Sequence, residues 1–518
     1  MPFLNHQSDA RCLINRRSRS LLIFGIALVA ITFCSPGDSF GQNLANNLGN
    51  NFTNATTIQS LNGTITQLAF DPNDDNSLYV TTGYNGVWRF DYQQGGATSN
   101  GQQIVDPSAE LNRNTDTANG GSYGLAFHDD PTLGSVLYLS RAFPNNTTQT
   151  TTAVGRGVNS LALGSIVRLT DTDGDGTWGN NNDVNQTVVD NILTTNWSHQ
   201  ISQFAVAGDT LYVGVGSRTN NGGATTGLGN SSASIGQGEA AHTGALNFIQ
   251  DLTLLSNDTT TDNISGFNID VPDGQDFSDA DLEAYLSDTQ AFTSTDQSKF
   301  RVFSTGLRNN FGITIGDQGD IFVSNNEGGE SPSSANPEDE VFITEFQADH
   351  GFAKENFEVG DYRDPINVDP SAQAAQTAGF FDPANASPEI SEIGQGAGVT
   401  GLAQISAPGN AFDDYLLVGR GAASVDSGTQ PAGGNDVVIV NPVTGNAQLF
   451  ANDVGNVVTD VIVDPFGDVL ISSAGGQSLD ANGLITHVSV FSVSVPEPSS
   501  LVLLGFSVLG LAARRRRC

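Results

Sequence analysis

A short pattern of hydrophobic and polar positions recurs six times along this 518-residue chain. In each copy an apolar stretch is followed by a polar turn and then by a second apolar stretch, in which Leu or Ile often precedes Tyr or Phe. β-branched and aromatic residues favour strands, and the Asn, Asp and Gly residues of the turns supply the positive φ angles that hairpins need. The pattern therefore predicts strand–turn–strand units at residues 66–81, 123–140, 201–216, 311–325, 400–419 and 460–473.

A repeated hairpin cannot bury its apolar faces alone. Six such units arranged around an axis bury one another and leave only short sheet edges. We therefore predict an all-β fold, a six-bladed β-propeller with long inserted loops. The longest insertion, residues 222–298, is rich in Gly, Ser and Asn, and residues 276–288 within it predict one short helix. A pair of β-sandwiches is the competing architecture, and the repeat argues against it.

Both ends of the chain have the character of targeting segments. Basic residues precede the apolar run 21–33, and small residues follow it, which predicts a secretory signal peptide over residues 1–41. At the other end, the triplet Pro496-Glu497-Pro498 precedes the apolar run 501–513 and four arginines. This run is short for a membrane span, which needs about 20 residues. A plain hydrophobic tail anchor is one reading of this end.

The C-terminal order of small motif, short apolar run and basic tail resembles the PEP-CTERM sorting signal of bacteria that carry exosortases. The resemblance implies export across the inner membrane and processing by an exosortase-type enzyme. It places the protein at the cell surface or in the extracellular matrix, with membrane anchoring through residues 501–513. The expected organisation is therefore a signal peptide (1–41), a propeller (42–490) and a sorting segment (494–518).

Charge narrows the choice of partners. The net charge is -36, and only two lysines, Lys299 and Lys354, lie between the terminal segments. Such an acidic surface repels phosphate backbones, so we expect no nucleic-acid partner, whereas Ca²⁺ is attracted. The three cysteines all lie in the end segments, which excludes a disulfide framework.

One acidic segment has the order of a calcium loop. Asp occupies its first, third and fifth positions, and Gly176 occupies the sixth. Alternate carboxylates converge on one ion, and the glycine permits the sharp bend. The alternative is an acidic turn without an ion. We predict a Ca²⁺ site formed by Asp171, Asp173, Asp175, Thr177 and Asp183.

Two residues directly before hairpin units are candidates for chemistry. His199 precedes the third unit and Arg308 the fourth, and the loops that lead into propeller blades open on the axial channel. Histidine can act as a general base near neutral pH, and arginine can bind an anion or a carbonyl oxygen. A hydrogen-bonded loop histidine and an inter-blade salt bridge are the structural alternatives.

Several motifs resemble the soluble quinoprotein glucose/sorbosone dehydrogenases. They are Gly306-Leu-Arg-Asn309, Glu327-Gly-Gly329, Glu338-Asp-Glu-Val341 and the segment 120–128, and the resemblance spans roughly residues 62–476. Those enzymes are six-bladed propellers that hold pyrroloquinoline quinone (PQQ) over the axial channel. They oxidise sugars by transferring a hydride to the quinone, so the resemblance implies a sugar substrate.

The resemblance also implies roles. His199 would take the proton of the substrate hydroxyl, and Arg308 would polarise the quinone carbonyl. The other implied contacts are to the cofactor or its Ca²⁺. Asn119, Asn309 and Arg420 would bind PQQ, and the backbone carbonyls of Gly328 and Gly329 would bind Ca²⁺.

The chain departs from that pattern where the family has paired arginines, because Val457 and Thr459 stand there. Three hypotheses follow. The first is an exported sugar oxidoreductase that uses PQQ and Ca²⁺. The second is a non-enzymatic surface propeller that binds glycan, such as cell-surface polysaccharide or matrix, or protein partners. The third is a Ca²⁺-stabilised structural protein of the matrix.

Overall fold

The six predicted hairpins are the first two strands of six four-stranded antiparallel sheets. A computed structural model describes residues 44–45, 48, 51–52, 56–61, 63–83, 86–105, 124–143, 161–180, 183–195, 201–217, 242–256, 290–326, 338–350, 389–395, 397–421, 435–452, 454, 457–474 and 483–490. All of them belong to one unit, Phe40–Cys518. The signal peptide, the sorting segment and the helix predicted over 276–288 lie outside the described residues.

Blades 1 to 3 follow one another along the chain. Their strands are β2 (Ile65–Asp71), β3 (Asp74–Thr82), β4 (Gly86–Gln93), β5 (Ala97–Val105), β6 (Leu125–Asp130), β7 (Gly134–Phe143), β8 (Leu161–Leu169), β9 (Asn185–Thr195), β10 (Ile201–Ala207), β11 (Thr210–Val215), β12 (Ala245–Ile249) and β13 (Arg301–Thr305). Between β12 and β13 the described residues form two short helices, α2 (Leu252–Ser256) and α4 (Gln290–Thr293).

Blades 4 to 6 complete the set. Their strands are β14 (Ile313–Ile315), β15 (Ile321–Asn325), β16 (Glu338–Thr344), β17 (Glu389–Gln395), β18 (Val399–Gln404), β19 (Leu416–Arg420), β20 (Asp436–Val440), β21 (Ala447–Ala451), β22 (Val457–Val463), β23 (Val469–Ala474), β24 (Gly483–Val488) and β1 (Thr56–Leu61). In the described part of the chain, no helix is both long and apolar enough to cross a membrane.

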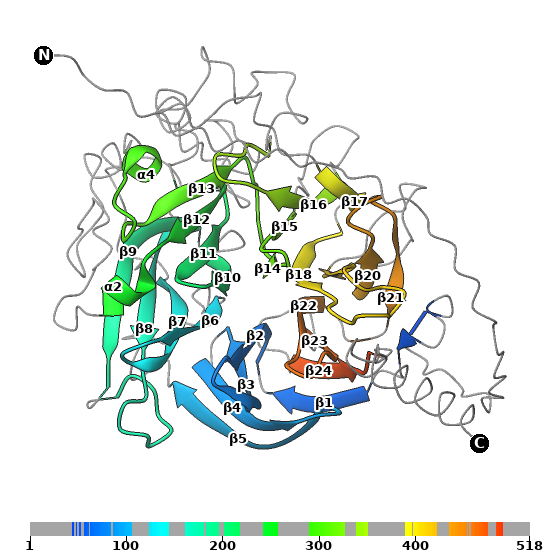
Figure 1. Ribbon diagram of the computed structural model, residues 1–518, viewed down its shortest axis with the longest axis horizontal. Helices are drawn as coiled ribbons and strands as arrows, with labels where there is room; N and C mark the ends of the chain where they lie inside the picture. Colours follow the sequence, from blue (N-terminus) through cyan, green and yellow to red (C-terminus); the bar gives the residue numbers. More distant parts are fainter. Residues whose placement is uncertain are drawn as a thin grey trace, which may run out of the picture. The chain divides into compact units, whose positions relative to one another are not determined.

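The six sheets form a ring around one axis (Figure 1). The strands nearest the axis are β2, β6, β10, β14, β18 and β22, and each contacts its counterpart in the next blade. The prediction of a six-bladed propeller is therefore confirmed. Because the blades are related by rotation, all innermost strands start at one end of the axis, here named the upper end. The hairpin turns that follow these strands lie at the lower end.

The apolar core is divided among the blade interfaces. Each of six clusters of buried hydrophobic residues joins two neighbouring sheets. Phe204 of blade 3 and Tyr138 of blade 2, for example, belong to one cluster, and Leu470 of blade 6 and Leu78 of blade 1 belong to another. Burial of these side chains drives the association of the sheets, because a single hairpin exposes the same faces to water.

The ring closes through the N-terminal strand. β1 pairs with β24 as the outermost strand of blade 6, with Thr56 opposite His487 and Leu61 opposite Gly483. Blade 6 therefore contains strands from both ends of the propeller. The sequence pattern did not predict this strand, because β1 lies apart from the hairpin repeat.

Glycines permit the close approach of innermost strands. A Cβ atom at Gly401 of β18 would lie 2.3 Å from the backbone nitrogen of Val461 in the next blade. At Gly312, just before β14, it would lie 2.3 Å from the carbonyl oxygen of Thr400. Side chains at these two positions would force the blades apart, so packing requires glycine at both.

Candidate functional site

Arg308 and Asn309 lie in the segment that joins blade 3 to β14, at the upper end. Both are buried, with 6% and 3% of their surface exposed. The carbonyl oxygen of Arg308 accepts a hydrogen bond from the backbone N–H of Ser217 at 2.6 Å. Blade 3 therefore holds this segment from one side.

Asn325, the last residue of β15, holds the same segment from the other side. Its Oδ1 accepts the backbone N–H groups of Arg308 at 2.9 Å and of Asn309 at 3.1 Å. Nη1 of Arg308 donates to the carbonyl oxygen of Asn326 at 3.2 Å, and the N–H of Asn326 donates to the carbonyl of Asn309 at 2.9 Å. The two flanks of the fourth hairpin therefore meet, with the arginine side chain directed to Asn326, which directly precedes Glu327.

Four predicted site residues lie outside the described residues. They are His199, Asn119, Gly328 and Gly329. The roles assigned to them remain predictions.

Arg420 pairs with a carboxylate of its own blade and also donates to the Ile393 carbonyl of blade 4 at 3.4 Å. This guanidinium is fully buried at the end of β19, and it donates from Nε and Nη2 to the two carboxylate oxygens of Asp436, at 2.6 Å each. Asp436 is the residue opposite it on β20. The positive charge that the resemblance assigned to a PQQ carboxylate is therefore balanced by Asp436.

Val457 and Thr459 begin β22, the innermost strand of blade 6. The Thr459 hydroxyl lies 2.9 Å from the Ser472 hydroxyl on β23. These positions contribute no charge where the resemblance places two arginines.

The acidic loop connects β8 to β9 and brings three predicted ligands together. Carboxylate oxygens of Asp171, Asp173 and Asp175 lie within 4.8 Å of one another. Gly176 has a φ of 83° and donates its N–H to Asp171 at 3.0 Å. Oδ1 of Asp171 is buried and accepts no hydrogen bond from the described residues. Three like charges at this spacing repel one another, and a cation between them would remove the repulsion.

Thr177 and Asp183, the other two predicted ligands, form hydrogen bonds within the loop. The carbonyl oxygen of Thr177 accepts a hydrogen bond from the Asn180 amide at 3.4 Å. Asp183 accepts the N–H of Thr172 at 2.7 Å and the N–H of Asn180 at 3.3 Å, and it is not among the three clustered carboxylates. Asp183 closes the loop through hydrogen bonds.

The acidic loop is fastened to blade 1. The N–H of Trp178 donates to the carbonyl of Ile104 on β5 at 3.1 Å. The indole ring packs edge-on against Tyr79 of blade 1 and Phe127 of blade 2, at centroid distances of 6.2 and 5.6 Å. A cation in the loop would therefore stabilise the seam between these two blades.

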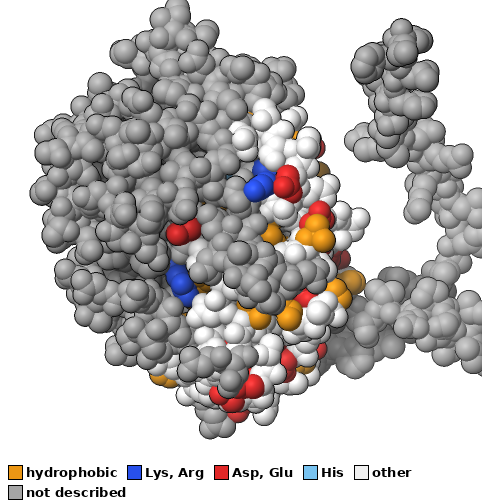
Figure 2. Space-filling view, turned by 90° about the vertical axis from the view of Figure 1, so that its left-hand side faces the viewer, with side chains coloured by type: hydrophobic (Ala, Val, Ile, Leu, Met, Phe, Trp, Pro, Cys, Tyr) orange, Lys and Arg blue, Asp and Glu red, His pale blue; other side chains and the backbone are white. Residues whose placement is uncertain are grey.

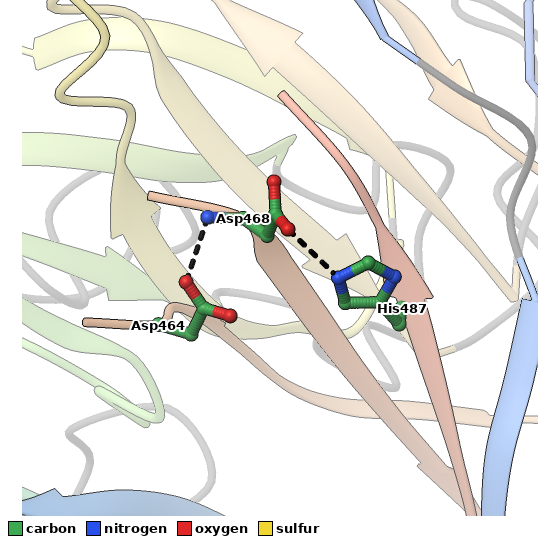
Figure 3. Close-up of side chains that lie close together, drawn as sticks. All are labelled: Asp464, Asp468 and His487. Atoms are coloured by element: carbon green, nitrogen blue, oxygen red, sulfur yellow. Dashed lines mark hydrogen bonds and ion pairs between the residues drawn. The ribbon is translucent and has the colours of Figure 1, made fainter. Parts of the chain in front are cut away.

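A second group of acidic and imidazole side chains, Asp464, Asp468 and His487, was not predicted (Figure 3). Asp464 accepts the Tyr92 hydroxyl at 2.5 Å and the N–H of Asp468 at 2.7 Å. Asp468 lies 3.0 Å from His487 Nε2 and accepts the N–H of Val490 at 2.8 Å. Burial raises the pKa of Asp464. Because protein donors occupy both carboxylates, the group fastens blade 6 to blade 1 and to the chain after β24.

The described surface carries few positive charges. On the described part of the surface in Figure 2, neutral polar side chains and backbone are interspersed with hydrophobic side chains, scattered carboxylates and few Lys or Arg side chains. This distribution agrees with the net charge of -36.

Comparison with known proteins identifies the C-terminal segment. The PEP-CTERM protein-sorting motif matches residues 494–517, which confirms the prediction for this end and indicates sorting to the cell surface. No curated protein matches the chain.

Solved structures with the same fold include sugar dehydrogenases. The holo form of the PQQ domain of pyranose dehydrogenase from Coprinopsis cinerea is 15% identical, covers 88% of this chain and 98% of that domain, and gives a TM-score of 0.50. A glucose dehydrogenase is 14% identical over 85% of this chain and 99% of its own, with a TM-score of 0.47. An oxidoreductase (glucose dehydrogenase) from Thermus thermophilus is 15% identical over 84% and 99%, with a TM-score of 0.47. The resemblance stated from the motifs is confirmed at the level of the fold.

Proposed function

We propose that this chain is an exported propeller, sorted to the cell surface, that binds a sugar at its upper end as quinoprotein sugar dehydrogenases do. The observation that carries the proposal is the position of Arg308 and Asn309, both fixed by Asn325 at that end. A guanidinium presents several N–H donors in a fixed plane, which suits neighbouring sugar hydroxyls or a carbonyl oxygen. Asn309 adds an amide next to it in the chain.

Oxidation of the sugar through PQQ is the finer hypothesis, with His199 as the base. PQQ is a tricarboxylate, so a tight site needs positive charges opposite its carboxylates. Arg420 is paired with Asp436, and Val457 and Thr459 are neutral. The described residues therefore do not fit PQQ at its carboxylates, and we derive no catalytic step through it.

The lack of available positive charge at Arg420, Val457 and Thr459 favours a second candidate, a non-catalytic propeller that binds glycan. A neutral sugar can bind without the cations that Arg420 and the start of β22 fail to supply. Cell-surface polysaccharide or matrix is the partner that fits a surface-sorted protein. Exosortase-type processing near Pro496–Pro498 and anchoring through residues 501–513 belong to this proposal.

Ca²⁺ is the proposed ion of the acidic loop. Asp171, Asp173 and Asp175 would supply carboxylate oxygens, and the ion would stabilise the seam between blades 1 and 2. This role is structural and independent of the upper end.

One preparation tests both candidates. The purified protein is mixed with PQQ and Ca²⁺, and dye reduction is followed with a panel of aldoses while sugar and glycan binding is measured by calorimetry. Turnover that disappears in His199→Ala supports the oxidoreductase, and saturable binding without turnover supports the glycan-binding propeller. Arg308→Ala should weaken binding, whereas Lys299→Ala, which also removes one cation, should not. Absence of both turnover and sugar or glycan binding would refute the proposal.

A further inference from the structure

A cavity of about 400 Å³ lies on the propeller axis, below the site just described. Residues of β2, β6, β10, β14, β18 and β22 line it, so all six blades contribute. Its lining extends from the middle of the innermost strands to Asp317 and Ser406 beside the hairpin turns. The cavity therefore belongs to the lower end, and its volume is within the range of sites for small molecules.

The carboxyl group of Asp460 lies at the inner part of this cavity. Only 2% of this residue is exposed. Its Oδ1 accepts the Gln203 amide at 2.7 Å and the N–H of Val461 at 2.8 Å, and its Oδ2 accepts the N–H of Leu68 at 2.8 Å. These donors are all neutral. Burial accordingly raises the pKa of Asp460 to about 7.

Hydrogen-bonding groups of several blades, both side-chain and backbone, meet around this carboxyl group. Gln203 comes from blade 3, Leu68 from blade 1 and Asp460 from blade 6. Gln67 donates to the carbonyl of Phe204 at 2.9 Å and accepts the N–H of Leu125 at 2.7 Å, which adds blade 2. The inner part of the cavity is thus a built polar site.

The ionisable side chains among the described residues that line the cavity are both acidic. They are Asp460 and Asp317, and these described residues include no Lys, Arg or His. At the mouth, Asp317 accepts the Ser406 hydroxyl at 2.6 Å and lies in an exposed turn. The cavity therefore favours a ligand that brings positive charge and hydrogen-bond donors. Phe127, Ile315 and Leu402 also line it, and they favour a ligand with a carbon chain.

We propose that this axial cavity binds a small organic ammonium ion, with its charged group next to Asp460. Such an ion supplies the missing positive charge and places its alkyl chain against the apolar side chains. A Ca²⁺ ion fits less well, because it needs six to eight oxygen ligands, whereas one carboxylate with both oxygens already hydrogen-bonded lies at the inner end. This inference does not depend on the proposed sugar site at the upper end.

Calorimetric titration of the purified full chain tests this proposal, with n-butylammonium chloride as the probe. The neutral alcohol n-butanol and calcium chloride are titrated in parallel. We expect saturable binding of n-butylammonium, weakened about tenfold or more in Asp460→Asn. Asp464→Asn is the matched control, because Asp464 is also buried but does not line the cavity; its dissociation constant should equal that of the parent.

Circular dichroism shows whether Asp460→Asn folds. If it does not, Asp317→Asn is compared with Asp320→Asn, since both residues lie in the same exposed turn and only Asp317 lines the cavity. A several-fold loss of affinity confined to Asp317→Asn supports the proposal. Any one of three results would overturn the proposal. These are the absence of saturable n-butylammonium binding, equal binding of n-butanol, and a calcium signal that is lost in the Asp460 or Asp317 variant.

Discussion

Asn325 accepts the backbone N–H of Arg308 at 2.9 Å and the next N–H at 3.1 Å, so one side-chain oxygen fixes the turn that presents the candidate arginine. Asn325 is fully buried at the end of β15. Asn325, the last residue of β15, thus determines the position of the loop that precedes the neighbouring strand β14.

Replacing Asn325 by Ala should destabilise the protein. The change leaves two buried N–H groups without their acceptor, and each such loss costs about 1–3 kcal/mol. We expect the free energy of unfolding to fall by about 2–6 kcal/mol in urea denaturation. Asn446→Ala, at an exposed position, is the control and should change it by less than about 0.5 kcal/mol. Equal effects of the two changes would contradict the role of Asn325.

A methyl group at Gly401 should also destabilise the propeller. In Gly401→Ala the new Cβ would lie 2.3 Å from Val461 N and 2.4 Å from Asp460 Cα, which are backbone atoms that cannot move independently. Overpacking of this kind costs about 1–3 kcal/mol. Gly83→Ala is the control, because its nearest described neighbour is Thr66 Cγ2 at 3.8 Å. Thermal unfolding measures both, and a Gly401→Ala variant as stable as Gly83→Ala would show that the strands can separate without cost.

The hairpin repeat was enough to predict the fold, because period-two patterns and turn residues are local properties of the chain. It did not predict β1, whose partner β24 lies more than four hundred residues away in the sequence. In the candidate site, too, sequence patterns predicted only features that are local in the chain. The acidic loop was found from spacing within one short segment, whereas the pairing of Arg420 with Asp436 depends on strand register. Asp460 was missed because its environment comes from blades 1, 3 and 6.

Ca²⁺ should raise the thermal stability through the acidic loop. If the ion binds Asp171, Asp173 and Asp175 only in the folded state, a hundredfold excess over the dissociation constant adds about 2.7 kcal/mol. Chelation should therefore lower the melting temperature, and Asp173→Asn should remove most of the response. Asp183→Asn tests whether Asp183 is a ligand of the ion, because in the structure its carboxylate accepts hydrogen bonds from the N–H groups of Thr172 and Asn180. It should keep the response to Ca²⁺, and loss of the response there would place Asp183 among the ligands.

The Arg420–Asp436 pair should act as a structural unit. Arg420→Met leaves a buried carboxylate without its cation, which costs about 3–5 kcal/mol. The double variant Arg420→Met with Asp436→Leu should recover part of this loss, because no unpaired charge remains. Urea denaturation of the single and double variants measures the coupling. If Arg420→Met is as stable as the parent and instead weakens PQQ binding, the guanidinium serves the cofactor.

The raised pKa of Asp460 gives a stability profile with a defined sign. Burial moves this pKa from 3.8 to about 7, so the folded protein holds the proton more tightly than the unfolded chain does. The contribution of this group is fully present below pH 4 and is lost as the pH rises through about 7, above which both states are ionised. Relative to Asp460→Asn, which does not titrate at this position, the parent should therefore lose stability over that interval, by up to about 4 kcal/mol.

Urea denaturation of both proteins at a series of pH values measures the difference. Below pH 4 and above pH 7 the difference should be flat, because the protonation of Asp460 is then the same in the folded and unfolded states. Asp320→Asn, in an exposed turn, is the control and should follow the parent across the interval. A difference between parent and Asp460→Asn that is constant with pH would mean that folding does not raise the pKa of Asp460. A difference that grows in favour of the parent as pH rises would mean that a counter-charge holds Asp460 ionised.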